Sequence, residues 1–523
     1  MKKNLFIYLL TVLCAVNLFT ACSDDDDDKD APQGDLNAPQ ITWAENPNFD
    51  TTEIKENMSA VINIDVENGL KSLQLDIKSA ALTNEILAVV GLSTSVDLVT
   101  IELTEDQASV IAGIPFGEKI KDATSLKFDI SKLVPMIMIL PNAAGNHTFS
   151  ITVTDNKGKS AKKDLVFHYI LPLGAASLSE QNTWNNTAKV TVDNVRETTT
   201  VQYRRQGETD WQEATRQEDN TFLISTKWTE SQNSAGLKIW TPDVKTGIWA
   251  AQTYEIAILD AGQEVSKATF ETSKGDAIPN GDMSEWSKKI WKDSQNKEYE
   301  ITYPNAKGTE GFWDSGNNTF VEQTMTPLCK EEVEGNGIAF LSAQKVLGAI
   351  FAAGNLFSGD FNFSGFSGTV NFGKKYTWTA RPRALKVRLK AEVGTIDNVG
   401  GSDPEKDNLK GKQDKIVLFA AVTDWTKQHG VTSGFGTPKG MWHPETQNSV
   451  EEGAIIGYAS KFITENITEY TTIEIPFNWY NSTDKPSTDN FSLVISGATS
   501  YRGDYLTGCS TNKLYIDSVE WVY

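Results

Sequence analysis

The chain has 523 residues, of which 39% are hydrophobic and 10% aromatic, and its formal net charge is −21 at pH 7. A chain of this length exceeds what one hydrophobic core can serve, so several globular domains are expected. Its basic residues form no cluster that could attract phosphates. The sequence therefore excludes nucleic acid and anionic lipid surfaces as partners.

The N-terminus has the pattern of a bacterial lipoprotein signal. Lys2 and Lys3 precede an apolar run over residues 5–18, which is short for a bilayer span, and Ala21 stands directly before Cys22. A small residue before a cysteine resembles the lipobox, which implies that residues 1–21 are a cleaved signal and that Cys22 carries the lipid. An ordinary secretory signal with a chance cysteine is the alternative.

The segment after the cysteine, residues 22–37, is predicted to be an extended acidic tether. Residues 24–28 are five consecutive aspartates, which repel one another and stay solvated. The run is either a plain spacer or a signal that resembles the export signal of surface lipoproteins in Bacteroidetes-type bacteria. We expect an outer-membrane protein exposed at the cell surface, with the lipid as its only membrane attachment, because no later segment is apolar enough to cross a bilayer.

Two β-sandwich domains are predicted to follow the tether. Residues 38–171 alternate apolar and polar side chains as an immunoglobulin-like sandwich does, with short helices expected at 84–90 and 105–111. Asn68-Gly69 predicts a hairpin between the strands on either side of it. Residues 172–275 resemble a fibronectin type III sandwich around the alternating segment 200–205.

Residues 276–523 are predicted to form one larger unit. Residues 385–393 alternate without a break, residues 416–422 are entirely apolar and typical of an inner strand, and residues 515–523 alternate again. Several strands without a long helix indicate a two-sheet jelly roll. The fold class is therefore mainly β, with tandem immunoglobulin-like sandwiches followed by a larger jelly-roll sandwich.

Short motifs along residues 278–523 resemble one known family, the putative carbohydrate metabolism domain of Bacteroidetes lipoproteins. These motifs lie at residues 280–286, 312–317, 353–359, 381–386, 503–508 and 514–519. The resemblance implies a jelly roll related to carbohydrate-binding modules, placed after immunoglobulin-like domains, and it supplies no catalytic residues.

Enzyme motifs are absent from the sequence. It has no phosphate-binding glycine loop with lysine, no Gly-x-Ser-x-Gly elbow and no His-Glu-x-x-His pair, and its four histidines lack metal-ligand spacing. His429 and His443 are interpreted as solvated loop residues. A glycoside hydrolase would need two carboxylates about a sugar bond, and spacing alone does not single out a pair among 69 acidic residues.

The one cofactor that the sequence suggests is a structural calcium ion. Asp282 is expected just inside the first strand of the last unit and Asp517 in its last strand, and a jelly roll brings its terminal strands together. Two carboxylates with nearby carbonyl oxygens would suit calcium. The alternative, two exposed aspartates at strand ends, stays open.

Four residues are candidates for contact with a glycan. Trp442 and His443 lie in a long polar loop where a large ring has little core to join, and Trp313 follows a glycine in a similar setting. Sugars stack their C–H faces on such rings, and a cation such as Arg381 can bond to their hydroxyls. Trp313 is equally well explained as a core residue.

The sequence as a whole predicts a surface lipoprotein that binds a polysaccharide or oligosaccharide through residues 276–523 without catalysis. Outer-membrane glycan-uptake proteins are its expected partners. A glycoside hydrolase with an unlocated carboxylate pair and a structural or adhesive surface protein remain as alternatives.

Overall fold

The computed structural model describes residues 38–292, 295–317, 329–330, 337–346, 350–365 and 367–523. Contacts divide the chain into two compact units, Met1–Pro172 and Leu173–Tyr523. The predicted signal, Cys22 and the acidic tether lie outside the described residues. Within the described part, no helix is both long enough and apolar enough to span a bilayer.

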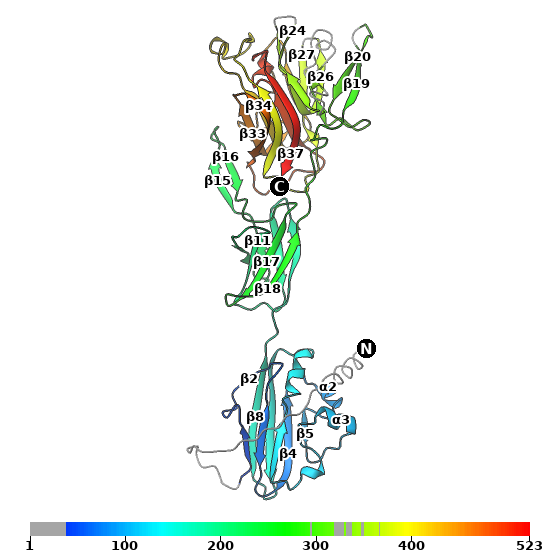
Figure 1. Cartoon of the computed structure of the whole chain (residues 1–523), viewed down its shortest axis with the longest axis vertical. Helices are drawn as coiled ribbons and strands as arrows, with labels where there is room; N and C mark the ends of the chain where they lie inside the picture. Colours follow the sequence, from blue (N-terminus) through cyan, green and yellow to red (C-terminus); the bar gives the residue numbers. More distant parts are fainter. Residues whose placement is uncertain (1–37, 293–294, 318–328, 331–336, 347–349, 366) are drawn as a thin grey trace. The chain divides into compact units, whose positions relative to one another are not determined.

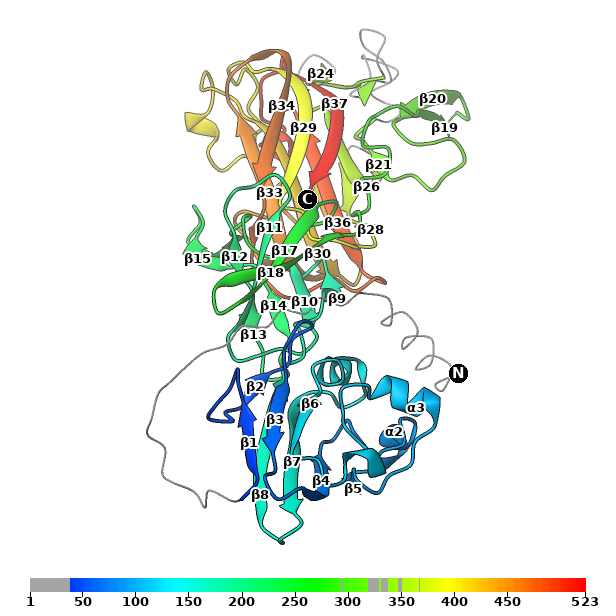
Figure 2. The same cartoon turned by 60° about the horizontal axis from the view of Figure 1, so that its bottom comes forward.

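The N-terminal unit is a sandwich of two β-sheets (Figure 2). One sheet has the order β1-β3-β6, and its strands are β1 (Gln40–Trp43), β3 (Val61–Asp65) and β6 (Ser125–Asp129). The other has the order β2-β8-β7-β4-β5, and its strands are β2 (Thr52–Glu53), β8 (Ser160–Tyr169), β7 (Gly145–Asp155), β4 (Leu70–Lys78) and β5 (Ser95–Asp97).

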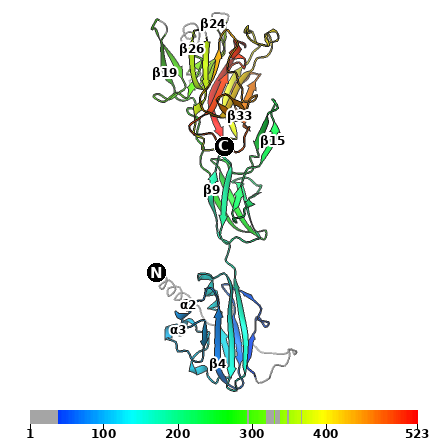
Figure 3. The ribbon, with the colours of Figure 1, turned by 180° about the vertical axis from the view of Figure 1, so that it is seen from behind.

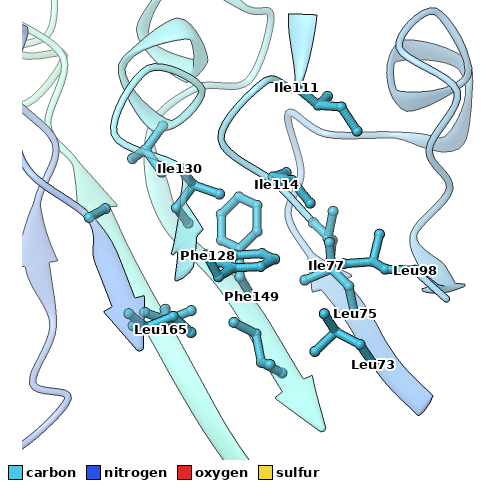
Figure 4. Close-up of a cluster of buried hydrophobic side chains, with 14 of the residues drawn as sticks. Leu73, Leu75, Ile77, Leu98, Ile111, Ile114, Phe128, Ile130, Phe149 and Leu165 are labelled. Carbon is cyan, nitrogen blue, oxygen red and sulfur yellow. The ribbon is translucent and has the colours of Figure 1, made fainter. Parts of the chain in front are cut away.

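Alternating apolar side chains of the two sheets meet between them and form the core of this unit. Phe128 from β6 and Phe149 from β7 lie together in the middle of the cluster, with Leu75 and Ile77 of β4 close by (Figure 4). Phe128 is fully buried and Phe149 is 7% exposed. The period-two pattern of the sequence thus buries one face of each sheet, as predicted.

Two short helices lie beside the β4–β5 edge of the larger sheet (Figure 3). They are α2 (Asn84–Ala88) and α3 (Glu105–Val110), and both confirm the helices predicted from sequence. The side chain of Thr104 caps α3 while Gln107 bonds back to the Thr104 backbone, which is a capping box. Two 3-10 helices complete the unit, η1 (Glu118–Ile120) and η2 (Val134–Ile139).

The prediction of a hairpin at Asn68-Gly69 is wrong. β3 and β4 flank this turn but do not pair, because β3 pairs with β1 and β6 whereas β4 pairs with β5 and β7. Gly69 has a φ of 77°, which fits a tight turn. The turn therefore carries the chain from one sheet to the other across the core.

The C-terminal unit begins with a small sandwich of two four-stranded sheets (Figure 1). The first has the order β13-β14-β10-β9, with β13 (Thr215–Arg216), β14 (Phe222–Ile224), β10 (Thr187–Val192) and β9 (Ala176–Asn182). The second has the order β12-β11-β17-β18, with β12 (Gln212–Glu213), β11 (Thr199–Arg205), β17 (Thr253–Asp260) and β18 (Gln263–Glu271).

A larger two-sheet sandwich follows, which agrees with the predicted mainly β fold class. Its smaller sheet has the order β22-β23-β37-β29-β34, with β22 (Cys329–Lys330), β23 (Ala339–Ser342), β37 (Lys513–Val522), β29 (Ala384–Glu392) and β34 (Ile467–Pro476). Figure 2 shows β34, β29 and β37 side by side as one layer.

The larger sheet of this sandwich has the main order β15-β16-β35-β33-β30-β36-β26-β27-β31. Its strands are β15 (Trp228–Gln232), β16 (Lys238–Pro242), β35 (Asn478–Trp479), β33 (Gly453–Ile463), β30 (Ile416–Trp425), β36 (Phe491–Ala498), β26 (Asn355–Ser364), β27 (Ser367–Phe372) and β31 (His429–Ser433). Three short strands pair beside this path, β21 (Trp313–Asp314), β28 (Lys374–Lys375) and β32 (Ser449–Val450).

The remaining described elements lie between these strands in the sequence. They are the pair β19 (Ser287–Lys292) and β20 (Glu298–Tyr303), the pair β24 (Gln344–Val346) and β25 (Ile350–Ala352), and the 3-10 helices η3 (Lys406–Asn408) and η4 (Gly503–Tyr505).

The small sandwich and the larger one share a core. Trp184, from the small sandwich, is 2% exposed and belongs to the core cluster that the inner faces of β29 and β30 form. The β15–β16 hairpin extends from the small sandwich beside β33, and its Trp240 is paired in register with Trp479 of β35 (Figure 1). The two sandwiches are therefore coupled by both backbone pairing and apolar packing.

Arg381 lies in this junction, which corrects its prediction as a glycan contact. Its side chain is fully buried, and its guanidinium carbon lies 4.6 Å, 5.2 Å and 4.3 Å from the rings of Trp184, Trp228 and Trp479. Its Nε donates to the Trp184 carbonyl at 2.7 Å. Burial lowers the pKa of Arg381 to about 9, so the side chain is still charged at pH 7. Enclosed by three indoles, it holds the two sandwiches together and does not reach a ligand at the surface.

Replacement of Trp184 tests this shared core. We expect Trp184→Ala to lower the free energy of unfolding of the C-terminal unit by about 3–5 kcal/mol, as large-to-small changes at buried tryptophans do. Denaturation of the chain from Ser23 onward, followed by tryptophan fluorescence, measures this unit, because Trp43 is the single tryptophan before residue 173 among the 14 of the chain.

Trp211→Ala is the matched control. Trp211 is half-buried and stacks on Arg204 at 4.4 Å within the small sandwich, so its loss should cost about 1 kcal/mol. Equal destabilisation by the two substitutions would contradict a special role of Trp184 in joining the sandwiches.

Candidate functional site

The outer face of β30 forms the floor of a cavity. Ile416 and Leu418 face the core between the two sheets, whereas Val417 and Phe419 face away from it in a second apolar cluster. Burial on both faces explains why this strand is almost continuously apolar in the sequence. A cavity of about 400 Å³ lies over the outer face.

One wall of the cavity is a ribbon of strands that branches from the main sheet. The first residues of β26 pair with β36, but from Gly359 onward β26 pairs with β27, which pairs with β31. A Cβ at Gly359 would lie 2.3 Å from the carbonyl oxygen of Asn371, so glycine permits this close approach. Four aromatic side chains of the ribbon line the cavity, Phe357, Phe361, Phe363 and Phe372. We call this cavity the aromatic pocket.

Trp313 lies in the core and not in the aromatic pocket, so its role as a glycan contact is not supported. It is 1% exposed, and its indole N–H donates to the Pro279 carbonyl at 2.9 Å. Its neighbour Asp314 accepts a hydrogen bond from the Phe361 backbone N–H at 2.9 Å, and burial raises the pKa of Asp314. Trp313 and Asp314 therefore have a structural role: they fix the part of β26 where the ribbon begins.

Trp442 lines the aromatic pocket, but it is half-buried, and the expectation that it has little core to join is wrong. Its ring lies edge-on to Phe372, Phe419 and Trp425, with centroids 5.7 Å, 5.4 Å and 5.0 Å apart. The apolar outer face of β30 supplies the packing surface that the polar loop around Trp442 lacks.

His429 anchors the loop that carries Trp442, and it is buried where a solvated residue was predicted. Its Nε2 lies 2.7 Å from the Gly440 carbonyl oxygen and its Nδ1 lies 2.6 Å from Glu452 Oε2. Burial alone would raise the pKa of Glu452, but the hydrogen bonds it accepts, that with His429 first among them, and the nearby charge of Lys427 together outweigh burial, so this pKa lies below its usual value. Both ring nitrogens of His429 thus lie within hydrogen-bond distance of an oxygen atom, which holds the ring in place.

His443 also lines the pocket and is 6% exposed, so the prediction of a solvated residue is wrong for it too. Its ring stacks on Phe462 at 5.4 Å, and its Nδ1 accepts from the Glu445 backbone N–H at 3.3 Å. Burial lowers the pKa of His443 to about 4, so the ring is neutral at pH 7. The proton is then on Nε2, which has no hydrogen-bond partner among the described residues.

Three further lining residues were not singled out from the sequence as site residues: Phe435, Tyr501 and Asp504. Phe435 is 62% exposed and Tyr501 is 38% exposed, so both present ring surface to solvent. Removal from water raises the pKa of Asp504, whose Oδ1 accepts from Ser433 Oγ at 2.6 Å. Asp504 stands in a motif of the family pattern, which was the one available signal.

The tip of the β15–β16 hairpin supports the pocket loop from the side of the small sandwich. Asn233 Nδ2 donates to the Glu445 carbonyl at 2.8 Å and to the Tyr458 hydroxyl at 2.9 Å, and Ser234 Oγ donates to Glu445 Oε1 at 2.6 Å. Glu445 follows His443 by two residues, so these contacts fix the loop next to the pocket.

The structure does not assemble a calcium site at Asp282 and Asp517. Gly281 runs beside β37, since its carbonyl accepts from Val519 N–H at 2.6 Å, but Asp282 lies in an exposed turn and not in a strand. The Asp517 carboxylate is bound by Arg388. Among the described residues there is no group of three or more acidic, histidine or cysteine side chains placed to hold a metal ion.

Residues 286–522 match the model of a family described as Putative carbohydrate metabolism domain. The resemblance predicted from the sequence is thereby confirmed for this range. Among curated proteins, none matches the chain significantly.

Several solved structures are similar to the chain at low identity. A putative glycoside hydrolase from Bacteroides vulgatus is 20% identical, with 47% of this chain and 97% of that one covered and a TM-score of 0.33. A putative glycoside hydrolase from Bacteroides thetaiotaomicron is 16% identical, with 63% and 98% covered and a TM-score of 0.31. The Bacteroides ovatus protein SGBP-B, bound to a mixed-linkage heptasaccharide, is 9% identical, with 88% and 99% covered and a TM-score of 0.14. All three TM-scores are below 0.5.

His443 should make the stability of the fold depend on pH. Its pKa falls from 6.5 to about 4 on burial, so between these values the unfolded chain binds a proton that the folded chain does not. The free energy of unfolding should therefore decrease as the pH falls from about 6.5 to about 4, by at most about 3 kcal/mol at 1.4 kcal/mol per pKa unit.

His443→Phe keeps an aromatic ring on Phe462 and removes the titrating group. Urea denaturation at a series of pH values from 4 to 7 should show a smaller loss of stability for this variant than for the unaltered chain. A variant that retains the whole pH dependence would contradict the assignment to His443.

Proposed function

We propose that this protein is a surface-exposed lipoprotein of the outer membrane that binds a glycan without catalysis, through the aromatic pocket of its C-terminal domain. The observation that carries the proposal is the pocket itself, in which aromatic rings from β26, β27, β30 and the loop around Trp442 surround a cavity of about 400 Å³. Aromatic rings with a few polar groups beside them are the usual means of holding a sugar ring. The match of residues 286–522 to a carbohydrate-related family supports the same conclusion.

The acidic groups of the pocket favour binding over hydrolysis. Glycosidases use two carboxyl groups on opposite sides of the scissile bond. Asp504 is the one carboxylate among the described residues that line the aromatic pocket. The pocket thus contains the aromatic rings that stacking on a sugar needs. Its described lining has one carboxyl group, whereas hydrolysis needs two.

A glycoside hydrolase remains the second candidate because of one observation on Asp504. A general acid needs a raised pKa, and the pKa of Asp504 is raised by its removal from water. A reducing-sugar assay run beside every binding measurement separates the two functions, since product release would establish hydrolysis.

Replacement of Phe435 tests the pocket as the binding site. Phe435 lines the pocket and is 62% exposed, so Phe435→Ala should leave the melting temperature unchanged while weakening binding by about 1 kcal/mol, the contribution of one stacked ring. The measurement is calorimetry or affinity electrophoresis of the chain from Ser23 onward against a panel of polysaccharides. Trp442→Ala is less informative, because Trp442 also packs against Phe419 and Trp425.

Ile290→Ala is the matched control, because Ile290 is 63% exposed in the same domain and does not line the pocket. It should change neither affinity nor stability. If a glycan binds and Phe435→Ala binds it as tightly as the unaltered chain does, the site lies elsewhere. If no polysaccharide binds, an adhesive role toward another protein becomes the better proposal.

The proposed location rests on the lipobox at Cys22 and the aspartates after it. Cys22→Ala should release the protein from the membrane fraction in soluble form, because the lipid is its proposed anchor. Protease treatment of intact cells should degrade the unaltered protein if it is displayed outside, where outer-membrane glycan-uptake proteins would be its partners. Complete protection until the outer membrane is broken would place it on the periplasmic face.

A further inference from the structure

Asp504 is the acidic group of the aromatic pocket, and one of its two carboxylate oxygens has no partner among the described residues. Its Oδ1 accepts from Ser433 Oγ at 2.6 Å, and both residues of this hydrogen bond line the cavity. No described residue donates a hydrogen bond to Asp504 Oδ2. This oxygen is not closed off from water, unlike the unpaired Nε2 of His443. A ligand in the cavity can therefore reach the free oxygen of Asp504.

The described lining of the pocket holds no cation that would offset this charge. No lysine or arginine is part of it, and His443 is neutral at pH 7, because burial lowers its pKa to about 4. Arg502, which stands close to Asp504 in the sequence, is bound by Asp403 and by Glu405 Oε1 at 3.0 Å. Removal from water raises the pKa of Asp504, and no positive charge among the described residues opposes it. A positive group on the ligand would compensate the carboxylate where the protein does not.

The aromatic rings of the pocket suit a positive group as well. The faces of aromatic rings carry a negative potential and attract ammonium groups within about 6 Å of the ring centre. Phe435 and Tyr501 line the cavity and are 62% and 38% exposed, so both rings present surface to a ligand. Phe435 belongs to the same segment as Ser433, and Tyr501 to the same segment as Asp504. The exposed rings and the carboxylate therefore lie on the two segments that the hydrogen bond between Ser433 and Asp504 joins.

From these contacts we propose that the glycan contains amino sugars with free amino groups, and that one protonated amino group enters the aromatic pocket. The ammonium group donates to Asp504 Oδ2 and lies against the ring faces of Phe435 and Tyr501. Its charge in turn favours the ionised form of Asp504. This inference rests on the proposed glycan-binding function and names the class of glycan. The cavity of about 400 Å³ is larger than one ammonium group, so the sugar that carries it stacks on the remaining rings.

The same contacts disfavour other sugars. A hydroxyl or an acetamido group at the position of the amine carries no charge, so its hydrogen bond to a carboxylate is weaker than that of an ammonium group. A uronate would place a second carboxylate beside Asp504 without a compensating cation in the described lining. The net charge of −21 attracts any cation to the protein, and the experiment must separate this general effect from the pocket.

Three oligosaccharides of equal length test the proposal. Fragments of chitosan, chitin and cellulose share one backbone and linkage, and carry an amino, an acetamido and a hydroxyl group at the same carbon. Calorimetry uses the chain from Ser23 onward at a slightly acidic pH, which keeps the amino groups protonated. We expect the chitosan fragment to bind at least tenfold more tightly than the other two, because it alone makes a charge-assisted hydrogen bond and a cation–ring contact.

Replacement of Asp504 assigns the preference to the pocket. Asp504→Asn keeps an acceptor for Ser433 Oγ and removes the charge, so it should abolish most of the preference for the chitosan fragment and leave the weak binding of the cellulose fragment unchanged. Asp489→Asn, the same change at an exposed residue of the domain that does not line the pocket, is the matched control and should alter neither. A preference that persists in Asp504→Asn, or that both variants lower equally, would trace it to the overall charge and overturn the proposal.

The outcomes separate this inference from the proposed function. Equal or tighter binding of the chitin or cellulose fragment, or binding of other polysaccharides alone, would overturn the amino group while the glycan-binding function stands. Absence of binding to these fragments and to the whole polysaccharide panel would overturn both. If Asp504→Asn does not fold, competition by free glucosamine against the bound chitosan fragment, with free glucose as its control, gives the decision. Stronger competition by glucosamine supports the proposal, and equal competition by the two sugars counts against it.

Discussion

The apolar side chains on both faces of β30 constrain the whole C-terminal domain. In an ordinary two-layer sandwich, the outer face of a central strand meets water and carries polar residues. Here Val417, Phe419 and Trp425 on the outer face need cover as much as Leu418 does on the inner face. The β26–β27–β31 ribbon and the loop of Trp442 provide that cover as a third layer. Because the ribbon leaves the sheet at Gly359, a cavity remains beneath it, and the aromatic pocket is this space.

The small sandwich contributes side chains to the core and to the support of the pocket loop. Trp184 fills part of the core beneath β30, and Arg381 binds Trp184 and Trp479 across the junction. The hairpin tip at Asn233 then reaches the backbone of Glu445 beside the pocket. Motion of the small sandwich against the larger one would disturb the pocket loop, so the two sandwiches carry the candidate site together.

The sequence predicted elements where periodicity alone decides the structure. The alternation in β29 and β37 is a local signal, and these strands and the two short helices α2 and α3 are where they were expected. The hairpin at Asn68-Gly69 failed because the same turn residues can join neighbouring strands or strands on opposite sides of a core. Which of the two occurs depends on the strands that pair from elsewhere in the chain.

The site was harder to predict because burial in loops depends on tertiary contacts. Trp442 and His443 were expected in a solvated loop, but that loop folds onto the outer face of β30. Arg381 stands next to Pro382 in a family motif that gives no sign of the three indoles around it. Asp504 and Ser433 are 71 residues apart in the sequence and meet only because η4 lies beside the end of β31.

The loop of Trp442 also shows how a glycine-rich segment can hold a site in place. Between Phe435 and Met441 it has no apolar side chain larger than Pro438, so packing along this stretch contributes little. Polar contacts take over that role: Thr432 and Lys439 exchange two backbone hydrogen bonds of 3.0 Å, and His429 donates to the Gly440 carbonyl. Such bonds are directional, unlike apolar contacts, so they fix the position of the ring of Trp442 more closely than burial alone would. The shape of the pocket thus depends on a few polar contacts at its edge as well as on the apolar surface that they hold in place.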